Sequence, residues 1–599
     1  MKGNRSKLIV LFVCTVLFSG IVKAQDEMWD KSASSREHPH IQWFRDAKFG
    51  MFIHWGLYSE LGGIWNGKRY YGSGEWIMHQ AKIPFREYAA VAERFNPTGF
   101  NADEWAQLAL DAGVKYMVIT AKHHEGFAMY DSKVSDFTIV RSTPYKKDPM
   151  KALAEATRKR GIQFGFYYSQ FIDWHEPDGG RNTWDFEESR KDYHKYYREK
   201  AIPQLKELLT GYGPLGIVWF DMPGGLTREQ TQQFIDTLRV LQPTSLFSSR
   251  VGQGLGDYRD FGDSEVPPTP IDGAWESIYT HNDSWGYIEH DMNFKTPDQI
   301  ITLLANVASK GGNLMLNVGP DGKGRIPEYS VAYLRETGKW LNINGESIYG
   351  TTAGFIPAQP WGVTTAKPGK LYLHVLDKPT DGKILVPGIS VNVKSVTTLR
   401  ENRSLTWKRN GTDVWIDLPK SSYDSPDEVL VLSYSGAEPA YQKDMPVTVS
   451  GSLSFNPVDA AFSVTYGNAQ TKSLTFSHYF GDWKHENCVT GMRSVSDSVS
   501  FATRITHPGD YRVILEYACP QESAKQEGVL RVNGKSYLFR TLRTSEFEKG
   551  APLMFIRHTV ATISVEHPGP CSLSVAPLNN GRELFKLKRI ILEPVKQIR

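Results

Sequence analysis

The feature that most limits how this chain can fold is a series of short apolar runs that each end in a polar residue. One run, Gly216 to Phe220, is β-branched and aromatic, and Asp221 follows it directly, before the turn residues Pro223 and Gly224. Such a run is typical of a buried strand. In a parallel sheet, Asp221 would lie at the C-terminal mouth of that strand, where barrel enzymes place catalytic groups. A single aspartate there could simply cap a loop, so the interpretation depends on the other runs.

Predicted strands alternate with predicted helices through the first half of the chain. Further strands are predicted at Phe49 to Ile53, Tyr116 to Lys122, Gln163 to Ser169, Ser245 to Ser249 and Asn313 to Val318. Helices are predicted at Ala102 to Ala112 behind the cap Asn101, Lys151 to Arg160, Glu187 to Leu209 and Thr227 to Leu241. This alternation favours βαβ units and a parallel sheet.

Polar residues gather at the predicted strand ends, namely His54, His123, His124, Tyr168, Asp221, Arg250 and Asn317. An open doubly wound sheet collects its site at one switch point. Polar ends on many strands instead favour an α/β fold with a closed, TIM-type (β/α)8-like barrel. Fewer than eight strands are convincing, so we expect the barrel to be irregular.

The 599 residues are too many for one hydrophobic core, and the pattern changes after Gly350. From there helices are scarce and short alternating strands follow one another, which is typical of antiparallel sandwiches. We predict a catalytic domain at 25–355, a small antiparallel β-sandwich at 356–436, and a jelly-roll β-sandwich at 447–599 that could be a carbohydrate-binding module.

The N-terminus has the features of a secretory signal. Lys2, Arg5 and Lys7 precede an apolar core from Leu8 to Val22 that is too short to span a bilayer comfortably, and Ala24 ends a small-residue cleavage pattern. We predict a signal peptide at 1–24 and a secreted or periplasmic protein that starts at Gln25. Four positive charges lie before Ala24, so the formal charge of +3 falls to about −1 without them. Nucleic acid and anionic membranes are therefore not expected partners.

Cysteine and histidine usage indicates no metal site. After the signal only Cys488, Cys519 and Cys571 remain, and one pair of them could bridge in an oxidising compartment. Three histidines could bind zinc, but adjacent His123 and His124 are not expected to face one ion, and no HExxH helix is present. The chain also lacks a Gly-rich phosphate loop and a GxSxG elbow, so no cofactor is expected.

The chemistry of the strand ends suits a sugar. Two carboxylates facing each other across a bond are the machinery of glycoside hydrolysis. Histidine, tyrosine and arginine suit ring hydroxyls, and indole faces suit apolar sugar faces. The 16 Trp, 28 Tyr and 29 Phe of the chain fit a carbohydrate-handling protein, although they fit a large β-rich core equally well.

Many ordered motifs resemble the α-L-fucosidases of glycoside hydrolase family 29. They span Trp43 to Gly350 and comprise Trp43-Phe44, Lys48-Phe49-Gly50, Phe52-Ile53-His54-Trp55-Gly56, Glu75-Trp76, His123-His124-Glu125-Gly126-Phe127, Tyr167-Tyr168-Ser169, Asp173-Trp174, Trp219-Phe220-Asp221, Trp275-Glu276, Ser284-Trp285-Gly286-Tyr287, Gly311-Gly312-Asn313-Leu314, Leu316-Asn317-Val318-Gly319-Pro320 and Gly345-Glu346-Ser347-Ile348-Tyr349-Gly350. Any one of these motifs would be weak evidence, but so many in order make a chance resemblance implausible.

The resemblance implies a retaining, metal-free exo-hydrolase that removes terminal α-L-fucose from fucosylated glycans. By that resemblance Asp221 is the nucleophile that forms a covalent glycosyl-enzyme. The residues implied to line the fucose subsite are His54, Glu75, Trp76, His123, His124, Tyr168, Trp219 and Arg250.

The acid/base residue is less well determined, because its position varies within the family. The resemblance implies Glu265, because its spacing after Arg250 matches that of the acid/base in one family member, with Glu276 after Trp275 as second choice and Asp263 as third. The proton donor needs a raised pKa, which partial burial beside an aromatic ring could provide. The alternative functions are α-L-galactosidase activity on the same scaffold and a catalytically dead glycan-binding protein.

Overall fold

The computed structural model describes residues 38–595, except for residues 71, 268, 380–381, 443–446, 450–452, 456–462, 478–482, 506 and 545–553. The predicted signal peptide at 1–24 and the start at Gln25 therefore lie outside the described residues. The described chain forms two compact units. The first contains the residues up to 262 together with 273–292 and 315–331, and the second contains 263–272, 293–314 and the residues from 332 onward.

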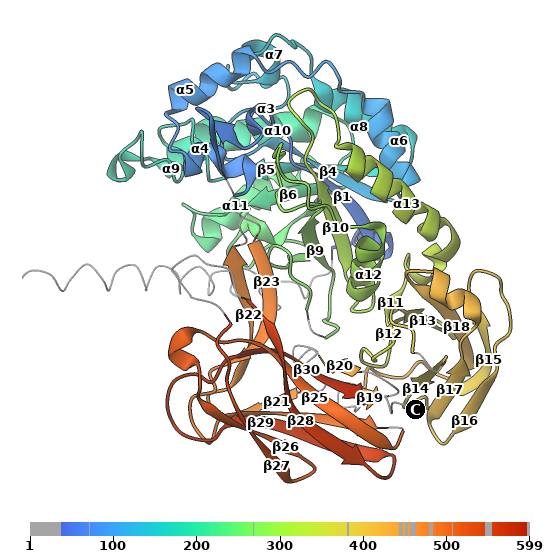
Figure 1. Ribbon diagram of the computed structural model, residues 1–599. Coiled ribbons are helices and arrows are strands. Elements are labelled where there is room, and N and C mark those ends of the chain that lie inside the picture. Colours follow the sequence, from blue (N-terminus) through green and yellow to red (C-terminus); the bar gives the residue numbers. More distant parts are fainter. Residues whose placement is uncertain are drawn as a thin grey trace, which may run out of the picture. The chain divides into compact units, whose positions relative to one another are not determined.

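An eight-stranded sheet is the centre of the N-terminal half (Figure 1). Its order is β7 (Leu246–Phe247), β6 (Ile217–Asp221), β5 (Gln163–Ser169), β4 (Tyr116–Lys122), β1 (Phe49–Ile53), β10 (Asn313–Val318), β9 (Trp275–Thr280) and β8 (Arg259–Asp260). The pairs β1–β4, β4–β5, β5–β6, β6–β7 and β8–β9 are parallel. A parallel bridge between Ser248 and Tyr258 joins the two ends of the sheet. The (β/α)8-like prediction is thus confirmed.

The irregularity of the barrel lies where its ends meet. Both β7 and β8 contain only two residues, so the predicted strand from Ser245 to Ser249 is shorter than expected. The strand β9, which carries Glu276, was not predicted. A two-residue strand has too few positions to show an apolar period, which is why β8 is not visible in the sequence.

The helices have the bounds α2 (Gln42–Ala47), α3 (Tyr58–Leu61), α4 (Ile77–Gln80), α5 (Phe85–Ala90), α6 (Ala102–Asp111), α7 (Ile139–Ser142), α8 (Pro149–Lys159), α9 (Tyr193–Tyr196), α10 (Ile202–Gly211), α11 (Arg228–Arg239), α12 (Pro297–Ala308) and α13 (Glu328–Asn344). Asn101 caps α6 by accepting hydrogen bonds from the backbone N–H groups of Asp103 and Glu104, as predicted. Thr227 forms a capping box with Gln230 at the start of α11.

The helical stretch predicted from Glu187 to Leu209 is present, but it begins later, at Tyr193, and is irregular. The segment contains a 3-10 turn, the short helix α9, a π-helical stretch at Tyr197–Ala201 and then α10. Pro203 has no N–H to continue the ladder of i to i−4 hydrogen bonds, and the π turn precedes it directly.

Alternation along the strands fills the barrel and places the polar residues above its core. The buried cluster inside the sheet contains Tyr167 of β5 and Trp219 of β6, which pair across the two strands. Two residues further on, Ser169 pairs with Asp221. Because side chains repeat every second residue in a strand, Asp221 lies on the same inward side as Trp219, one layer nearer to the C-terminal mouth.

The C-terminal half is built from antiparallel sheets. One pair of sheets has the orders β11 (Thr352–Ala353), β12 (Gly362–Lys367), β13 (Lys370–Val375), β18 (Glu428–Ser435), β15 (Asn392–Thr398), and β14 (Lys383–Val386), β17 (Asp413–Asp417), β16 (Trp407–Asn410). Its buried cluster runs from Phe355 to Tyr434 in sequence.

The last two sheets have the orders β19 (Val447–Val449), β24 (Ser498–Ile505), β29 (Gly569–Pro577), β26 (Glu527–Val532), β27 (Lys535–Arg540), and β22 (Gln470–Ser477), β23 (Trp483–Thr490), β30 (Lys586–Pro594), β25 (Gly509–Ala518), β28 (Ile556–Val565). The strand β21 (Ser463–Tyr466) pairs with β24, and β20 (Leu453–Phe455) pairs with β30. A separate buried cluster runs from Ala469 to Leu592 in sequence. C-terminal β-sandwiches were therefore predicted correctly.

Two features of this last region bear on the predictions. Cys519 and Cys571 are buried free thiols, and burial raises the pKa of each to about 11, so these two do not bridge. A polar pocket of about 550 Å³ is lined by Asn468, Gln470, Thr490, Gly491, Arg493, Glu583 and Lys586.

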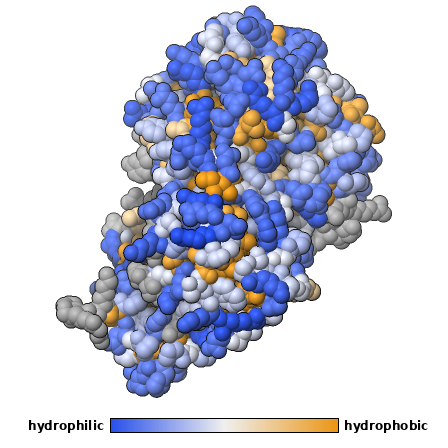
Figure 2. All heavy atoms as spheres, turned by 90° about the vertical axis from the view of Figure 1, so that its right-hand side faces the viewer, coloured by the Kyte–Doolittle hydropathy of each residue, from blue (hydrophilic) through white to orange (hydrophobic). Residues whose placement is uncertain are grey.

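Hydrophilic residues cover most of the face seen in Figure 2. Among the described residues, we find no helix with the length and apolar character needed to cross a membrane.

Candidate active site

The Asp221 carboxylate ends β6 and is held by donors on both oxygens. Arg250 Nη1 donates to Oδ1 at 3.1 Å, and the Tyr167 hydroxyl donates to Oδ2 at 2.8 Å. The backbone N–H of Asp221 donates to Gln170 Oε1 at 2.9 Å, which fixes the end of the strand. The Asp221 side chain is 11% exposed. A cation and a hydroxyl donor both favour the charged form, so the carboxylate is kept ionised.

His124 presents an acceptor nitrogen to this carboxylate. The Ser169 hydroxyl donates to the carbonyl of Ile172, so it accepts at 2.7 Å from His124 Nδ1, which must carry the proton. Burial lowers the pKa of His124 well below its usual range, and the charge of Lys122 lowers it further. The ring is therefore neutral, with the lone pair of Nε2 lying 3.5 Å from Asp221 Oδ2. Two acceptors at this distance leave a place for a bridging hydroxyl donor.

The tautomer of His54 follows in the same way from the hydrogen bonds of Asn317. Asn317 Nδ2 donates to the carbonyl of Trp285 at 2.7 Å, so Asn317 Oδ1 accepts at 2.7 Å from His54 Nδ1. Nε2 is then the acceptor nitrogen of His54. The ring of His123 lies 5.5 Å from that of His54 and 4.1 Å from that of His124. Burial lowers the pKa of His123 well below its usual range, so it too is neutral.

Of the two adjacent tyrosines, the structure brings Tyr167 to Asp221. Tyr168 was predicted to line the site, but its hydroxyl donates to Gln204 of α10 at 2.8 Å and its side chain is fully buried. Successive residues of a strand point to opposite faces, so only one of the pair can enter the barrel. The register of β5 against β6, in which Tyr167 pairs with Trp219, decides that Tyr167 is the one.

Trp219 and Arg250 form a layer beneath the carboxylate. The indole of Trp219 stacks on Tyr167 with ring centres 5.4 Å apart, and the Arg250 guanidinium carbon lies 4.9 Å from its ring centre. Trp219 is 1% exposed. It therefore supports the floor of the site, where cation–π contact with Arg250 helps to hold the guanidinium in place.

Glu75 and Trp76 lie in the short turn Gly74–Trp76 that leads into α4. Glu75 is buried, and its Oε2 accepts from the backbone N–H of Gly286 at 2.7 Å. The half-buried indole of Trp76 makes edge contacts with His124 and Trp174, each at 5.2 Å between ring centres. Trp76, Trp174 and His124 thus form one aromatic wall.

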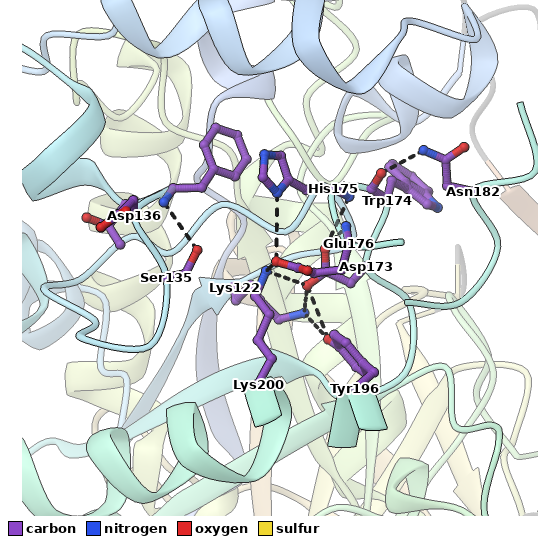
Figure 3. Close-up of polar contacts among 12 residues, drawn as sticks. Lys122, Ser135, Asp136, Asp173, Trp174, His175, Glu176, Asn182, Tyr196 and Lys200 are labelled. Carbon is purple, nitrogen blue, oxygen red and sulfur yellow. Dashed lines mark hydrogen bonds and ion pairs between the residues drawn. The ribbon is translucent and has the colours of Figure 1, made fainter. Parts of the chain in front are cut away.

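A buried ionic cluster holds the loop that carries Trp174 (Figure 3). Lys122 and Lys200 contact Asp173 Oδ2 at 3.2 and 3.0 Å, and the Tyr196 hydroxyl donates to the same oxygen. Burial alone would raise the pKa of Asp173, but the two lysines outweigh it and lower that pKa. Trp174 N donates to the carbonyl of His124 at 2.7 Å, which links the cluster to the histidines.

The carboxylates considered for the acid/base role lie in different surroundings. Glu276 is fully buried on β9, where its oxygens accept from Trp219 Nε1 at 2.8 Å and from the Tyr116 hydroxyl at 2.9 Å. Glu265 and Asp263 are half-buried in the segment 263–272, which is grouped with the second unit.

One group of side chains has the composition of a metal site. His123, His124 and Asp221 each offer a ligand atom, and these atoms lie within 4.8 Å of one another. Adjacency in sequence thus does not keep the two histidines apart, contrary to expectation. However, Arg250 and Tyr167 already donate to the two oxygens of Asp221, and a cation beside Arg250 would be repelled.

The site therefore combines an ionised, firmly held carboxylate, neutral histidines with acceptor nitrogens, and an aromatic wall. A carboxylate of this kind can attack an electrophilic carbon or stabilise a developing positive charge. Neutral histidine acceptors and a buried glutamate suit the hydroxyl groups of a small polyol ligand.

Comparison with known proteins agrees with this chemistry. The sequence profile of the family described as Alpha-L-fucosidase matches residues 15–346. The plasma alpha-L-fucosidase of Homo sapiens is 30% identical over 435 residues, which cover 66% of this chain and 88% of that protein.

Solved structures agree as well. The alpha-L-fucosidase from Vibrio sp. strain EJY3 is 29% identical, with a TM-score of 0.74, and the match covers 94% of this chain and 98% of that one. A trapped covalent intermediate of an alpha-L-fucosidase GH29 from Bacteroides thetaiotaomicron, in complex with 2-fluoro-fucosyl fluoride, is 30% identical, with a TM-score of 0.61 and coverage of 67% and 97%.

Proposed function

This chain belongs to the α-L-fucosidase family of glycoside hydrolases, and we propose that it releases terminal α-L-fucose from fucosylated glycans with retention of configuration. The observation that carries the proposal is the Asp221 carboxylate, held by Arg250 and Tyr167 at the mouth of β6 and facing the neutral histidine His124. The covalent intermediate named for the Bacteroides enzyme supports a double displacement.

We assign Asp221 as the nucleophile. Its charge is maintained by Arg250, and its position is fixed by the hydrogen bond from its backbone to Gln170. In the first step Asp221 would attack the anomeric carbon while a carboxylic acid protonates the leaving oxygen, and in the second step that same residue would activate water. Holding the nucleophile in one geometry before substrate arrives removes part of the entropic barrier.

The sugar would be recognised through its hydroxyl groups. A hydroxyl placed beside His124 Nε2 and Asp221 Oδ2 can donate its proton to either acceptor. His54 Nε2 offers a further acceptor, and Glu75 a buried carboxylate. Trp76 and its aromatic neighbours would pack against the apolar face and methyl group of fucose.

We propose Glu265 as the acid/base. It lies on a half-buried segment five residues after Asp260 of β8. Glu276, the second choice, has both oxygens engaged by Trp219 and Tyr116 in a fully buried setting, which supports a different role for it.

We also propose that the protein is secreted or periplasmic and that its last domain binds glycan. The predicted leader supports the location. The polar pocket in the last sandwich supports the binding role, because its amide, arginine, lysine and glutamate side chains offer both donors and acceptors to hydroxyl groups.

The test uses the full mature chain and 4-nitrophenyl α-L-fucoside, with the matched α-L-galactoside and β-D-galactoside alongside. Asp221→Asn should lower kcat by on the order of 10⁴-fold, whereas Asp236→Asn on the exposed face of α11 should leave it unchanged. Peptide mapping after 2-fluoro-fucosyl fluoride treatment should find the label on Asp221. A label on another carboxylate would overturn the assignment, and preferential cleavage of the galactoside would favour an α-L-galactosidase.

If the aryl fucoside is not cleaved, a panel of fucosylated oligosaccharides separates the remaining possibilities. Release of fucose from one linkage alone would identify a linkage specialist. Binding of fucose without release from any of them would identify a glycan-binding protein and refute the proposed activity.

A further inference from the structure

A second pair of acidic side chains lies inside the barrel, next to Trp219 and away from any role assigned above. Asp260 of β8 and Glu276 of β9 are direct partners in the parallel ladder between these strands. Glu276 is fully buried and Asp260 is 8% exposed. Glu276 lies between Ala274 and Ile278 in sequence, and both of these belong to the barrel core. Two ionised carboxylates in such surroundings would repel each other strongly.

The hydrogen bonds around the pair indicate where a proton lies. Glu276 accepts from Trp219 Nε1 and from the Tyr116 hydroxyl, so each of its oxygens already has a donor. Asp260 Oδ2 accepts from the Ser249 hydroxyl at 3.2 Å. Asp260 Oδ1 is buried, and with both carboxyls ionised no described group donates to it. A protonated Glu276 that donates a hydrogen bond to Asp260 removes the repulsion between the two carboxylates. It also supplies the donor that the buried Asp260 oxygen otherwise lacks.

The electrostatics agree with this arrangement. Burial raises the pKa of Glu276 well above its usual range, and the neighbouring charge and hydrogen bond of Asp260 raise it further. Burial raises the pKa of Asp260 as well, but the hydrogen bond from Glu276 and the charge of Arg250 oppose that rise, whereas for Glu276 burial and the neighbouring charge act in the same direction. Glu276 is therefore the carboxylic acid of the pair, and Asp260 is the carboxylate.

We propose that Glu276 and Asp260 form a carboxylic acid–carboxylate pair that positions Trp219 and Arg250 for catalysis by Asp221. Glu276 holds the edge of the Trp219 indole, and Arg250 lies over the face of that indole while donating to Asp221. Arg250 Nη2 also donates at 3.3 Å to the carbonyl of Phe261, the residue after Asp260, so the end of β8 helps to hold the guanidinium. Neither acid of the pair is proposed to touch the sugar, so both are positioning residues.

This inference rests on the proposed function, and replacement of Glu276 tests it. In Glu276→Gln the amide oxygen can accept from Trp219, while the two N–H groups of the amide can donate to Asp260 and to the Tyr116 hydroxyl oxygen, which reverses the direction of the Tyr116 bond. We expect kcat/KM within about 3-fold of wild type and unchanged thermal unfolding. In Glu276→Ala both contacts are lost, and we expect kcat/KM to fall by about 10- to 100-fold.

Labelling by 2-fluoro-fucosyl fluoride separates positioning from proton donation. A fluoride leaving group needs little help from an acid, so an acid/base variant should still be labelled at nearly the normal rate. A displaced nucleophile should be labelled slowly. We therefore expect slow labelling of Glu276→Ala, normal labelling of Glu276→Gln, and no rescue of either by azide.

Several results would overturn the inference while leaving the proposed function intact. One is azide rescue of Glu276→Gln after a large loss of kcat, because it would make Glu276 the acid/base. Another is wild-type labelling of a folded Glu276→Ala. If Glu276→Ala does not fold, Trp219→Phe replaces it as the test of the inference. Loss of the indole N–H should slow labelling about 10-fold, and labelling at the wild-type rate would overturn the inference. Failure of the wild-type enzyme to be labelled or to cleave fucosides would instead refute the proposed function.

Discussion

Replacement of the buried Glu125 with glutamine should change how the stability of this protein depends on pH. Glu125 follows the two site histidines and is 1% exposed. Burial raises its pKa to about 8 in the folded protein, against 4.5 for the ordinary side chain. The folded state therefore binds a proton more tightly than the unfolded state. The contribution of this group to stability is full below pH 4.5 and is lost as the pH rises toward 8.

The magnitude follows from this shift in pKa. Between pH 4.5 and 8 the loss is at most about 1.4 kcal/mol per pH unit, so from pH 5 to pH 7 it is about 3 kcal/mol. Glutamine does not titrate, so Glu125→Gln should lack this loss. Its stability relative to wild type should rise by about that amount between pH 5 and pH 7, and should level off above pH 8. For a domain of this size the change corresponds to a Tm difference that grows by roughly 6–12 °C.

The assay is thermal unfolding of both proteins at a series of pH values, followed by tryptophan fluorescence. Comparison of the variant with wild type cancels the titrations of groups that do not interact with residue 125, because these are common to both proteins. An exposed control, Glu155→Gln on α8, should give a curve parallel to wild type. If the Tm difference between Glu125→Gln and wild type does not change with pH, the carboxyl is not held protonated and the reasoning is wrong.

Three further predictions test other parts of the structure. Lys122→Met should destabilise the first unit by about 3–5 kcal/mol, because it removes one partner of a buried ion pair. Lys195→Met at an exposed pair should leave the unfolding transition nearly unchanged in the same denaturation assay. Prolonged EDTA treatment should leave fucoside cleavage unchanged, and a loss restored by zinc would instead make His123, His124 and Asp221 a working metal site. Arg493→Ala should weaken binding of the whole chain to immobilised fucosylated glycan without changing aryl fucoside cleavage, and equal binding by the variant and wild type would count against the sandwich pocket.

The sequence alone determined the fold class and the identities of the main residues around Asp221. Apolar runs followed at once by a polar residue mark the C-terminal ends of buried strands, and β1, β4, β5, β6 and β10 lie where those runs predicted them. Because parallel strands bring their C-terminal ends to one edge, the polar residues that follow β4, β6 and β7 meet there, as the contacts of His124 and Arg250 with Asp221 show.

Tertiary structure decided which face each side chain takes and which partner it meets. Tyr167 and Tyr168 are indistinguishable in composition, and only the pairing of β5 with β6 shows that Tyr167 points to Asp221. The tautomers of His54 and His124 depend on Asn317 and Ser169, which lie 263 and 45 residues away in the chain.

The acids Glu276 and Asp260 illustrate the same limit most clearly. Neither β8 nor β9 was predicted from the sequence, and Glu276 was a candidate acid/base because it follows Trp275 in a motif that resembles the family. Burial, and the pairing of β8 with β9 that brings Asp260 beside it, raise the pKa of Glu276 well above its usual range. No local sequence pattern indicates this shift. Protonation depends on desolvation and on neighbouring charges, and both arise only when distant segments pack together.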